Sequence, residues 1–169
     1  MNRHKTHIVV GVVAGQPAAV VATAATFAEH FHADLVCVVV NGARYTIGQR
    51  PDGSVVSLSI NPDLADEVVE VFAPSMRAAV AAVLEDRDVS WSVRALAGGP
   101  AQELARVADE LDAAMIVLGT HEAGVRGSVH EFFNGSVAAQ LAHRQHRPVV
   151  VVPLNPVGDG ALPWDEGKR

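Results

Sequence analysis

Four short, continuous runs of apolar residues most strongly constrain the fold of this chain. Each run is rich in β-branched residues and reads as a strand buried on both faces. The runs are Ile8–Val13, Leu35–Val40, Met115–Leu118 and Val149–Val152. A fifth run, Val89–Leu96, alternates and is expected to be less fully covered. Because helical patterns separate the runs, the sequence predicts an α/β domain: an open, doubly wound parallel sheet with helices on both faces.

Two prolines mark predicted helix starts. Pro17 and Pro100 each precede an apolar stripe at helical spacing, and proline is favoured in the first turn of a helix. The first stripe is Val20, Ala24, Phe27 and Phe31, and the second is Leu104, Val107, Ala108 and Leu111. A further periodic stretch, Leu64–Glu85, is interrupted at Pro74. This interruption predicts either a kink or a restart of the helix.

Residues 41–62 form a long connection after the second predicted strand. Alternation over Ser54–Ile60, after the turn sequence Pro51-Asp52-Gly53, favours a β-hairpin in place of an open loop. The insertion leaves the carboxyl end of a strand, which is where open α/β sheets bind ligands. We therefore expect a flap over a binding site or, alternatively, an arm that contacts a second subunit.

Charge and composition exclude several classes of protein. The formal net charge is −6 and the basic residues are scattered, whereas a nucleic-acid binder concentrates them on one face. A cluster of Arg144, His146 and Arg147 is better explained by a favourable position at a helix C-terminus. No run approaches the roughly 18 apolar residues of a membrane span, and no signal segment precedes the first strand. The single cysteine, Cys37, reads as a small buried residue in a reducing compartment, so the cytoplasm is the expected location.

The segment from Ala114 to Pro153 carries the clearest sign of a binding site. It reads as a strand, a glycine-containing loop, a helix opened by Gly135-Ser136, and a second strand. The N–H groups of Ser136 and Val137, with the Ser136 hydroxyl, could hold phosphate oxygens at the helix start. The alternative is that Ser136 only caps the helix. A capping-box pattern at Ser128–Glu131 also allows the helix to begin earlier.

These residues resemble the signature of the universal stress protein family. The resemblance rests on Gly119, Gly135-Ser136 and the run Arg147–Pro153, and spans roughly residues 7–153. It implies one domain over residues 1–153, a five-stranded sheet in the order 3-2-1-4-5, and a tail over residues 154–169. Nucleotide-binding members have a second glycine where this chain has Glu122, and their loop to Gly135 is three residues shorter. Gly124 and Gly127 lie inside the longer loop and could substitute in space.

The resemblance implies a cytoplasmic stress-response or regulatory module that binds ATP or another adenine nucleotide at the carboxyl edge of the sheet. The implied site residues are Val13, Val40, Gly119, Thr120, Gly124, Gly127, Gly135, Ser136 and Val137. Relatives place an acidic residue after the first strand, whereas Val13 cannot accept a hydrogen bond, and Gln16 could compensate. The alternative is a dimeric stress protein that binds no nucleotide and acts through protein partners. A hydrolase or transferase of the wider fold group is a third reading.

The sequence predicts neither catalytic residues nor a metal site. The pairs His30/His32 and His143/His146 have ligand-like spacing, but no third ligand accompanies them. A nucleophile elbow and the Gly-Lys-Ser/Thr ending of a P-loop are both missing from the sequence. We therefore expect weak ATP hydrolysis at most.

The last predicted strand indicates a homodimer. Residues 147–153 form an apolar strand expected at one edge of the sheet, where unpaired main-chain groups need a partner. Pairing with the same strand of a second subunit about a two-fold axis satisfies both copies. Members of the family commonly dimerise in this way, and proline at Val150 is expected to break the pairing.

Overall fold

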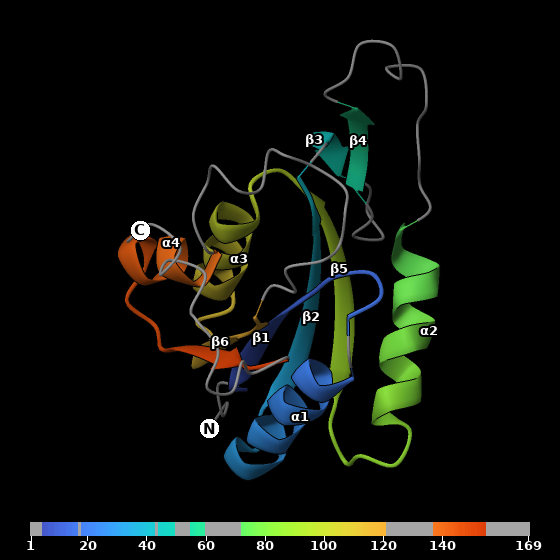
Figure 1. The fold of residues 1–169 in the computed structure, drawn as a ribbon, viewed down its shortest axis with the longest axis vertical. Helices are drawn as coiled ribbons and strands as arrows, with labels where there is room; N and C mark the ends of the chain where they lie inside the picture. Colours follow the sequence, from blue (N-terminus) through green and yellow to red (C-terminus); the bar gives the residue numbers. More distant parts are fainter. Residues whose placement is uncertain are drawn as a thin grey trace, which may run out of the picture.

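A computed structural model describes residues 5–16, 18–42, 44–49, 55–59, 72–120 and 137–154. Its main feature is a five-stranded parallel sheet in the order β5-β2-β1-β6-β7 (Figure 1). The strands are β1 (His7–Val12), β2 (Asp34–Asn41), β5 (Trp91–Ala97), β6 (Met115–Gly119) and β7 (Val149–Val152). Numbered among themselves along the chain, these strands have the order 3-2-1-4-5, which confirms the predicted topology and places β7 at an edge.

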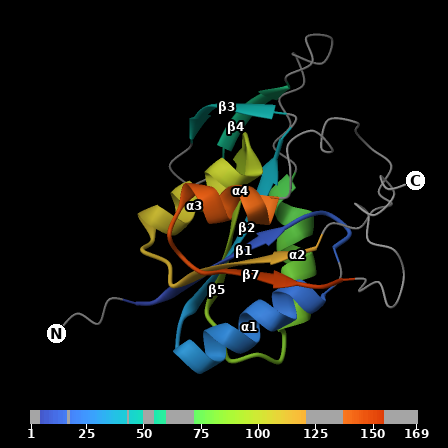
Figure 2. The ribbon, with the colours of Figure 1, turned by 60° about the vertical axis from the view of Figure 1, so that its left-hand side comes forward.

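In the described part of the chain, four helices cover the two faces of this sheet. The helices α1 (Ala19–Phe31) and α2 (Phe72–Leu84) share one apolar core with the sheet, whereas α3 (Pro100–Glu110) and α4 (Val137–Arg144) share a second core on the other face. Figure 2 shows α3 and α4 on one side of the sheet and α1 on the other. None of the helices within the described ranges combines the length and apolar character needed to cross a bilayer.

The central strands explain why the apolar runs are continuous. Alternate residues of β1 face opposite cores: Ile8 and Val10 pack with α1 and α2, while Val9 packs with α3 and α4. All three side chains are fully buried. Because the strand has a core on each face, a polar side chain at any of these positions would lose its hydration, which costs free energy.

The connection after β2 contains a hairpin-like pair of strands. The strand β3 (Arg44–Gln49) pairs antiparallel with β4 (Val55–Ser59), as the alternating sequence predicted, and both contact β5. The predicted turn at Pro51-Asp52-Gly53 and residues 60–71 lie outside the described part of the chain. The role as a flap or contact arm stays a prediction.

Two helix predictions need comment. Pro100 begins α3 as predicted, whereas Pro17 lies outside the described residues. The helix α2 starts at Phe72, so Pro74 lies in its first turn, where the missing N–H costs no helical hydrogen bond. This favours the restart over the kink.

The predicted apolar stripe of α1 was wrong at its end. Phe31 is 52% exposed, because it is the last helical residue before His32 turns the chain with a φ of 50°. The side chains that α1 buries are Val20, Val21, Ala24, Ala25 and Ala28.

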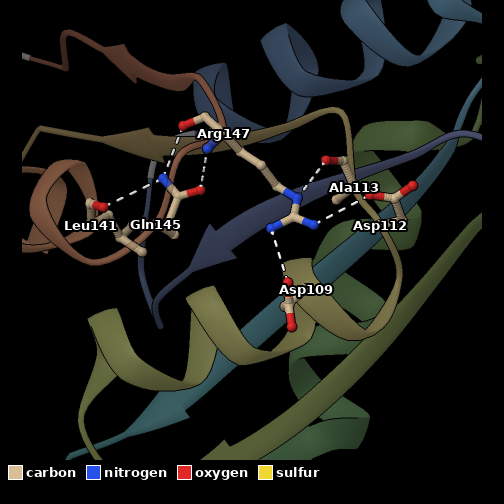
Figure 3. Close-up of polar contacts among 6 residues, drawn as sticks. All are labelled: Asp109, Asp112, Ala113, Leu141, Gln145 and Arg147. Atoms are coloured by element: carbon tan, nitrogen blue, oxygen red, sulfur yellow. Dashed lines mark hydrogen bonds and ion pairs between the residues drawn. The ribbon is translucent and has the colours of Figure 1, made fainter.

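The sequence suggested that the side chain of Arg147 lies at the C-terminal end of α4. In the structure this side chain instead contacts the C-terminal end of α3 and the residues that follow it (Figure 3). Its Nε donates to the Ala113 carbonyl over 2.9 Å, and its two Nη atoms pair with Asp109 and Asp112. The side chain that bonds to the C-terminal end of α4 is Gln145. Its Nε2 donates to the carbonyls of Leu141 and Arg147, and its Oε1 accepts from the Arg147 N–H. The guanidinium therefore links two connections that are far apart in the sequence.

Candidate functional site

The carboxyl edge of the sheet has a point where the chain direction diverges. After β1 the chain enters α1 on one face, and after β6 it continues to α4 on the other face. Ligands of open α/β sheets bind at such a point, because the two connections leave a crevice between them. The predicted residues Val13, Val40, Gly119 and Thr120 all lie at this edge, at the ends of β1, β2 and β6.

The strands reach different heights at this edge. The last residue of β1, Val12, pairs with Val39, but β2 continues to Asn41, which pairs with Ala97 of β5. At this edge β1 therefore ends two residues before β2 does. The turn that follows β1 lies beside the last residues of β2, and its conformation shapes the candidate site.

That turn comprises Val13, Ala14, Gly15 and Gln16. The Gln16 N–H donates to the Val13 carbonyl over 3.2 Å, and Gly15 has a φ of 74° at the third position, as a type II turn requires. The side chain of Gln16 closes the turn a second time, because its Oε1 accepts from the Val13 N–H over 2.9 Å. The Val13 side chain is 62% exposed. It therefore offers an apolar surface at the end of β1.

Gly119 has a packing role that the sequence did not reveal. A Cβ atom at this position would lie 2.8 Å from Gln16 Nε2, 2.9 Å from Val20 Cγ2 and 3.1 Å from Leu154 Cδ1. These distances are shorter than ordinary van der Waals contacts, so any larger residue would displace its neighbours. Glycine therefore has a packing role here, whether or not a ligand binds.

Thr120 joins the end of β6 to the end of β7. Its N–H donates to the Val152 carbonyl over 2.9 Å, and its Oγ1 accepts from the Leu154 N–H over 2.8 Å. The amide is therefore already engaged within the protein. The hydroxyl hydrogen is the group through which Thr120 could reach a ligand.

The other predicted residues divide into two groups. The side chains of Val40 and Val137 are partly buried against the core beneath α3 and α4, so main-chain atoms are their means of contact with a ligand. Val137 is the first described residue of α4. Gly124, Gly127, Gly135 and Ser136 lie outside the described residues, as do both alternatives for the start of the last helix.

The sequence analysis predicted the start of α3 at Pro100 but did not assign this helix start to the candidate site at the carboxyl edge. Gly98, with a φ of 134°, donates its N–H to the carbonyl of Asn41 at the end of β2. Gly99 then begins α3 without a side-chain cap, and Ala18 begins α1 in the same way. Both helix starts direct their positive dipole ends to the carboxyl edge. The signal in the sequence was Gly98-Gly99-Pro100.

Two other features are separate from this site. A cleft of about 160 Å³ at the opposite, amino edge is lined by His7, Asp34, Ser90, Ser92 and Arg94, among others. Nucleotide-sized ligands occupy cavities of roughly 300 Å³ or more, so this cleft is too small for one. Among the residues that the structure describes, no group of three or more His, Cys, Asp or Glu side chains is arranged to hold a metal ion.

Comparison with known proteins gives a consistent result. The model of the universal stress protein family matches residues 4–153. No curated protein matches the chain closely enough to count as a relative. Among solved structures, a protein from the universal stress protein family of Burkholderia pseudomallei is 24% identical, with a TM-score of 0.56, over 90% of this chain and 99% of that one.

Two further similar structures contain ligands. The universal stress protein of Archaeoglobus fulgidus in complex with dAMP is 18% identical, with a TM-score of 0.55, over 88% of this chain and 98% of that one. A universal stress protein in complex with cAMP is 20% identical, with a TM-score of 0.56, over 89% of this chain and 98% of that one. At these identities the likeness establishes a shared fold.

Proposed function

The chain belongs to the universal stress protein family, and from this premise we propose that it is a cytoplasmic regulatory protein that binds an adenine nucleotide at the carboxyl edge of its sheet. The observation that carries the proposal is the convergence of Val13, Val40 and Gly119 at the point where the connections after β1 and β6 diverge. The complexes of relatives with dAMP and cAMP support an adenine nucleotide as the ligand class. ATP is the specific ligand that we propose.

The chemistry of the edge supports an anionic ligand. The sequence Gly135-Ser136 directly precedes α4, and the amides of a helix start offer hydrogen bonds to phosphate oxygens. The starts of α1 and α3 add their dipoles at the same edge. Main-chain groups near Val40 and Gly119 are the proposed contacts of the nucleoside part.

The test begins with the nucleotides released when freshly purified protein is denatured. Titration calorimetry then measures the binding of ATP, ADP, AMP and cAMP to the stripped protein. We expect binding that is weakened at least tenfold by Ser136→Ala combined with Gly135→Val. The matched control is Ser92→Ala, an exposed serine at the amino edge, which is expected to bind normally. Absence of both released nucleotide and binding heat would overturn the proposal.

The second candidate is a family member that binds no nucleotide and acts through protein partners. The exposed, apolar side chain of Val13 favours it, because the carboxylate of nucleotide-binding relatives is replaced by a group without hydrogen-bonding capacity. The engaged amide of Thr120 points the same way. A negative result in the nucleotide titration, with an intact dimer, is the outcome expected for this function.

We also propose that the protein is a homodimer formed through β7. This strand lies at the edge of the sheet, and Val151 is 44% exposed there. An apolar edge strand of this kind is prone to pair with another chain, and a two-fold axis satisfies both copies equally.

A further inference from the structure

The edge strand β7 turns few main-chain groups toward another chain. The Ile116 N–H donates to the Pro148 carbonyl, and the register of Val149 opposite Ile116 and Val151 opposite Leu118 follows from it. By the alternation of a parallel strand, the N–H and C=O groups of Val149 and Val151 therefore point away from the sheet. Within the described part of the chain, no residue bonds to these outward groups.

The carboxamide of Gln145 occupies the main-chain groups just before this strand (Figure 3). Its Oε1 accepts the Arg147 N–H over 2.6 Å, and its Nε2 donates to the Arg147 carbonyl over 2.9 Å. One side chain thus makes the pair of bonds that a neighbouring strand would otherwise make. Pro148, the next residue, has no N–H to donate. An added strand therefore meets no unbonded main-chain donor before Val149.

Different groups close the other end of β7. Pro153 follows the strand and lacks an N–H, so it offers only its carbonyl. The Leu154 N–H is already donated to Thr120 Oγ1 over 2.8 Å. In the described structure, the unbonded N–H groups along this edge are therefore those of Val149 and Val151. The two donors and two acceptors of these two residues are called the pairing window below.

The pairing window is complementary to a second copy of itself. With a two-fold axis at Val150, Val149 lies opposite Val151 of the second copy, and residues paired in this way exchange both bonds. Every group of both windows is then satisfied. An axis at Val151 would instead set Val149 against Pro153, which has no donor for the Val149 carbonyl. An axis at Val149 would set Val151 against Arg147, whose main-chain groups are already occupied.

We propose that Gln145 and Pro153 confine strand pairing at this edge to the pairing window, and thereby fix a homodimer whose two-fold axis passes beside Val150. The inference rests on the proposed homodimer and adds to it a register and the two residues that enforce it. A short window closed at both ends also limits pairing with longer foreign strands, which is the hazard of an exposed sheet edge.

Cysteine substitution along β7 with mild oxidation tests the register. In the proposed register the two copies of Val150 have Cα atoms about 4.5 Å apart, within reach of a disulfide. Those of Val151 are about 8 Å apart, which is too far. We expect Val150→Cys to form a covalent dimer on non-reducing gels and Val151→Cys to form about tenfold less. Ser92→Cys, exposed at the amino edge, controls for random collisions, and the buried Cys37 is expected not to react.

The role of Gln145 is tested with Gln145→Ala, which releases both main-chain groups of Arg147. The axis at Val149 then becomes available, so cross-linking of Val149→Cys is expected to rise several-fold when Gln145→Ala is added. Gln102→Ala, the same change at an exposed position of α3, is the control and should leave this cross-linking unchanged. Unchanged cross-linking of Val149→Cys with Gln145→Ala would overturn the role of Gln145.

The outcomes separate the register from the dimer itself. Stronger cross-linking of Val151→Cys than of Val150→Cys would overturn the register and leave the homodimer intact. Cross-linking of neither variant, in a protein that light scattering shows to be dimeric, would do the same. A monomeric wild-type protein would overturn both the homodimer and the inference that rests on it.

Discussion

The guanidinium of Arg147 donates to the main-chain carbonyl of Ala113, the residue that leads into β6. The arginine lies just before β7, so the bond joins the entries of two neighbouring parallel strands (Figure 3). The Arg147 side chain is only 9% exposed, whereas its partners Asp109 and Asp112 are largely open to solvent. The carbonyl bond is therefore the part of the network that is most protected from water.

Replacement of Arg147 by methionine is expected to lower the free energy of unfolding by about 1–3 kcal/mol. The reason is that the buried Ala113 carbonyl loses its side-chain partner, while the exposed carboxylates regain water and contribute little. Urea denaturation measures the change. Arg144→Met, at an exposed position of α4, is the control and should stay near the wild-type value. Equal stability of both variants would show that the link is energetically unimportant.

Replacement of Gly119 by alanine is expected to destabilise the protein by about 1–3 kcal/mol through overpacking against Gln16, Val20 and Leu154. Thermal and urea unfolding without nucleotide detect this loss. The control is Gly42→Ala, whose added Cβ would have its nearest neighbour at 3.8 Å. A Gly119→Ala protein as stable as the wild type, but unable to bind nucleotide, would instead show that the glycine serves only the ligand.

The dimer is tested by proline at Val151, not at Val150 as the sequence analysis expected. The carbonyls of Pro148 and Val152 accept bonds from β6, so by the alternation of a parallel strand Val150 also faces β6. Proline at Val150 would thus damage the fold itself. The Val151 N–H faces away from β6, so Val151→Pro removes an outward donor at little cost to the monomer.

Light scattering is expected to show a dimer for the wild type and a folded monomer for Val151→Pro. Val151→Thr, which keeps the N–H and the branched shape, serves as the control and should remain dimeric. A monomeric wild-type protein would refute the dimer, and a dimeric Val151→Pro protein would place the interface elsewhere.

Cys37 is expected to be inert in the folded protein and to make stability depend on alkaline pH. Burial raises the pKa of its thiol from 9.0 to about 12. Between these values the unfolded chain releases a proton that the folded protein keeps, so stability is complete below pH 9 and falls as pH rises toward 12. The free energy of unfolding is expected to fall by about 2 kcal/mol between pH 9 and pH 10.5.

The measurement for Cys37 compares urea unfolding of the wild type and Cys37→Ala across this pH range. The alanine variant is less stable throughout because it leaves a cavity, but its stability should decline less steeply. A thiol reagent at pH 8 should modify the wild type only under unfolding conditions. Rapid modification of the native protein would contradict the burial of this residue.

Many elements of the fold could be predicted because their cause is local. Continuous apolar runs such as Leu35–Val40 indicated strands covered on both faces, and Pro100 marked the start of a helix. The alternation of residues 54–60 indicated the pairing that β3 and β4 adopt. The strand order came from the family resemblance, because parallel pairing joins segments whose neighbourhood no local pattern specifies.

Contacts between residues that are distant in the sequence were decided only by the tertiary structure. Gly119 was predicted as a ligand glycine, but its packing against Gln16 and Leu154 became visible only when the ends of β1, β6 and β7 were brought together. Arg147 was assigned to the wrong helix for the same reason. Hydrophobic periodicity and turn chemistry depend on adjacent residues, whereas register, chain crossing and the direction of each N–H depend on the assembled sheet. The sequence by itself therefore determined the elements and their class, and the assembled sheet decided which side chains meet at its edges.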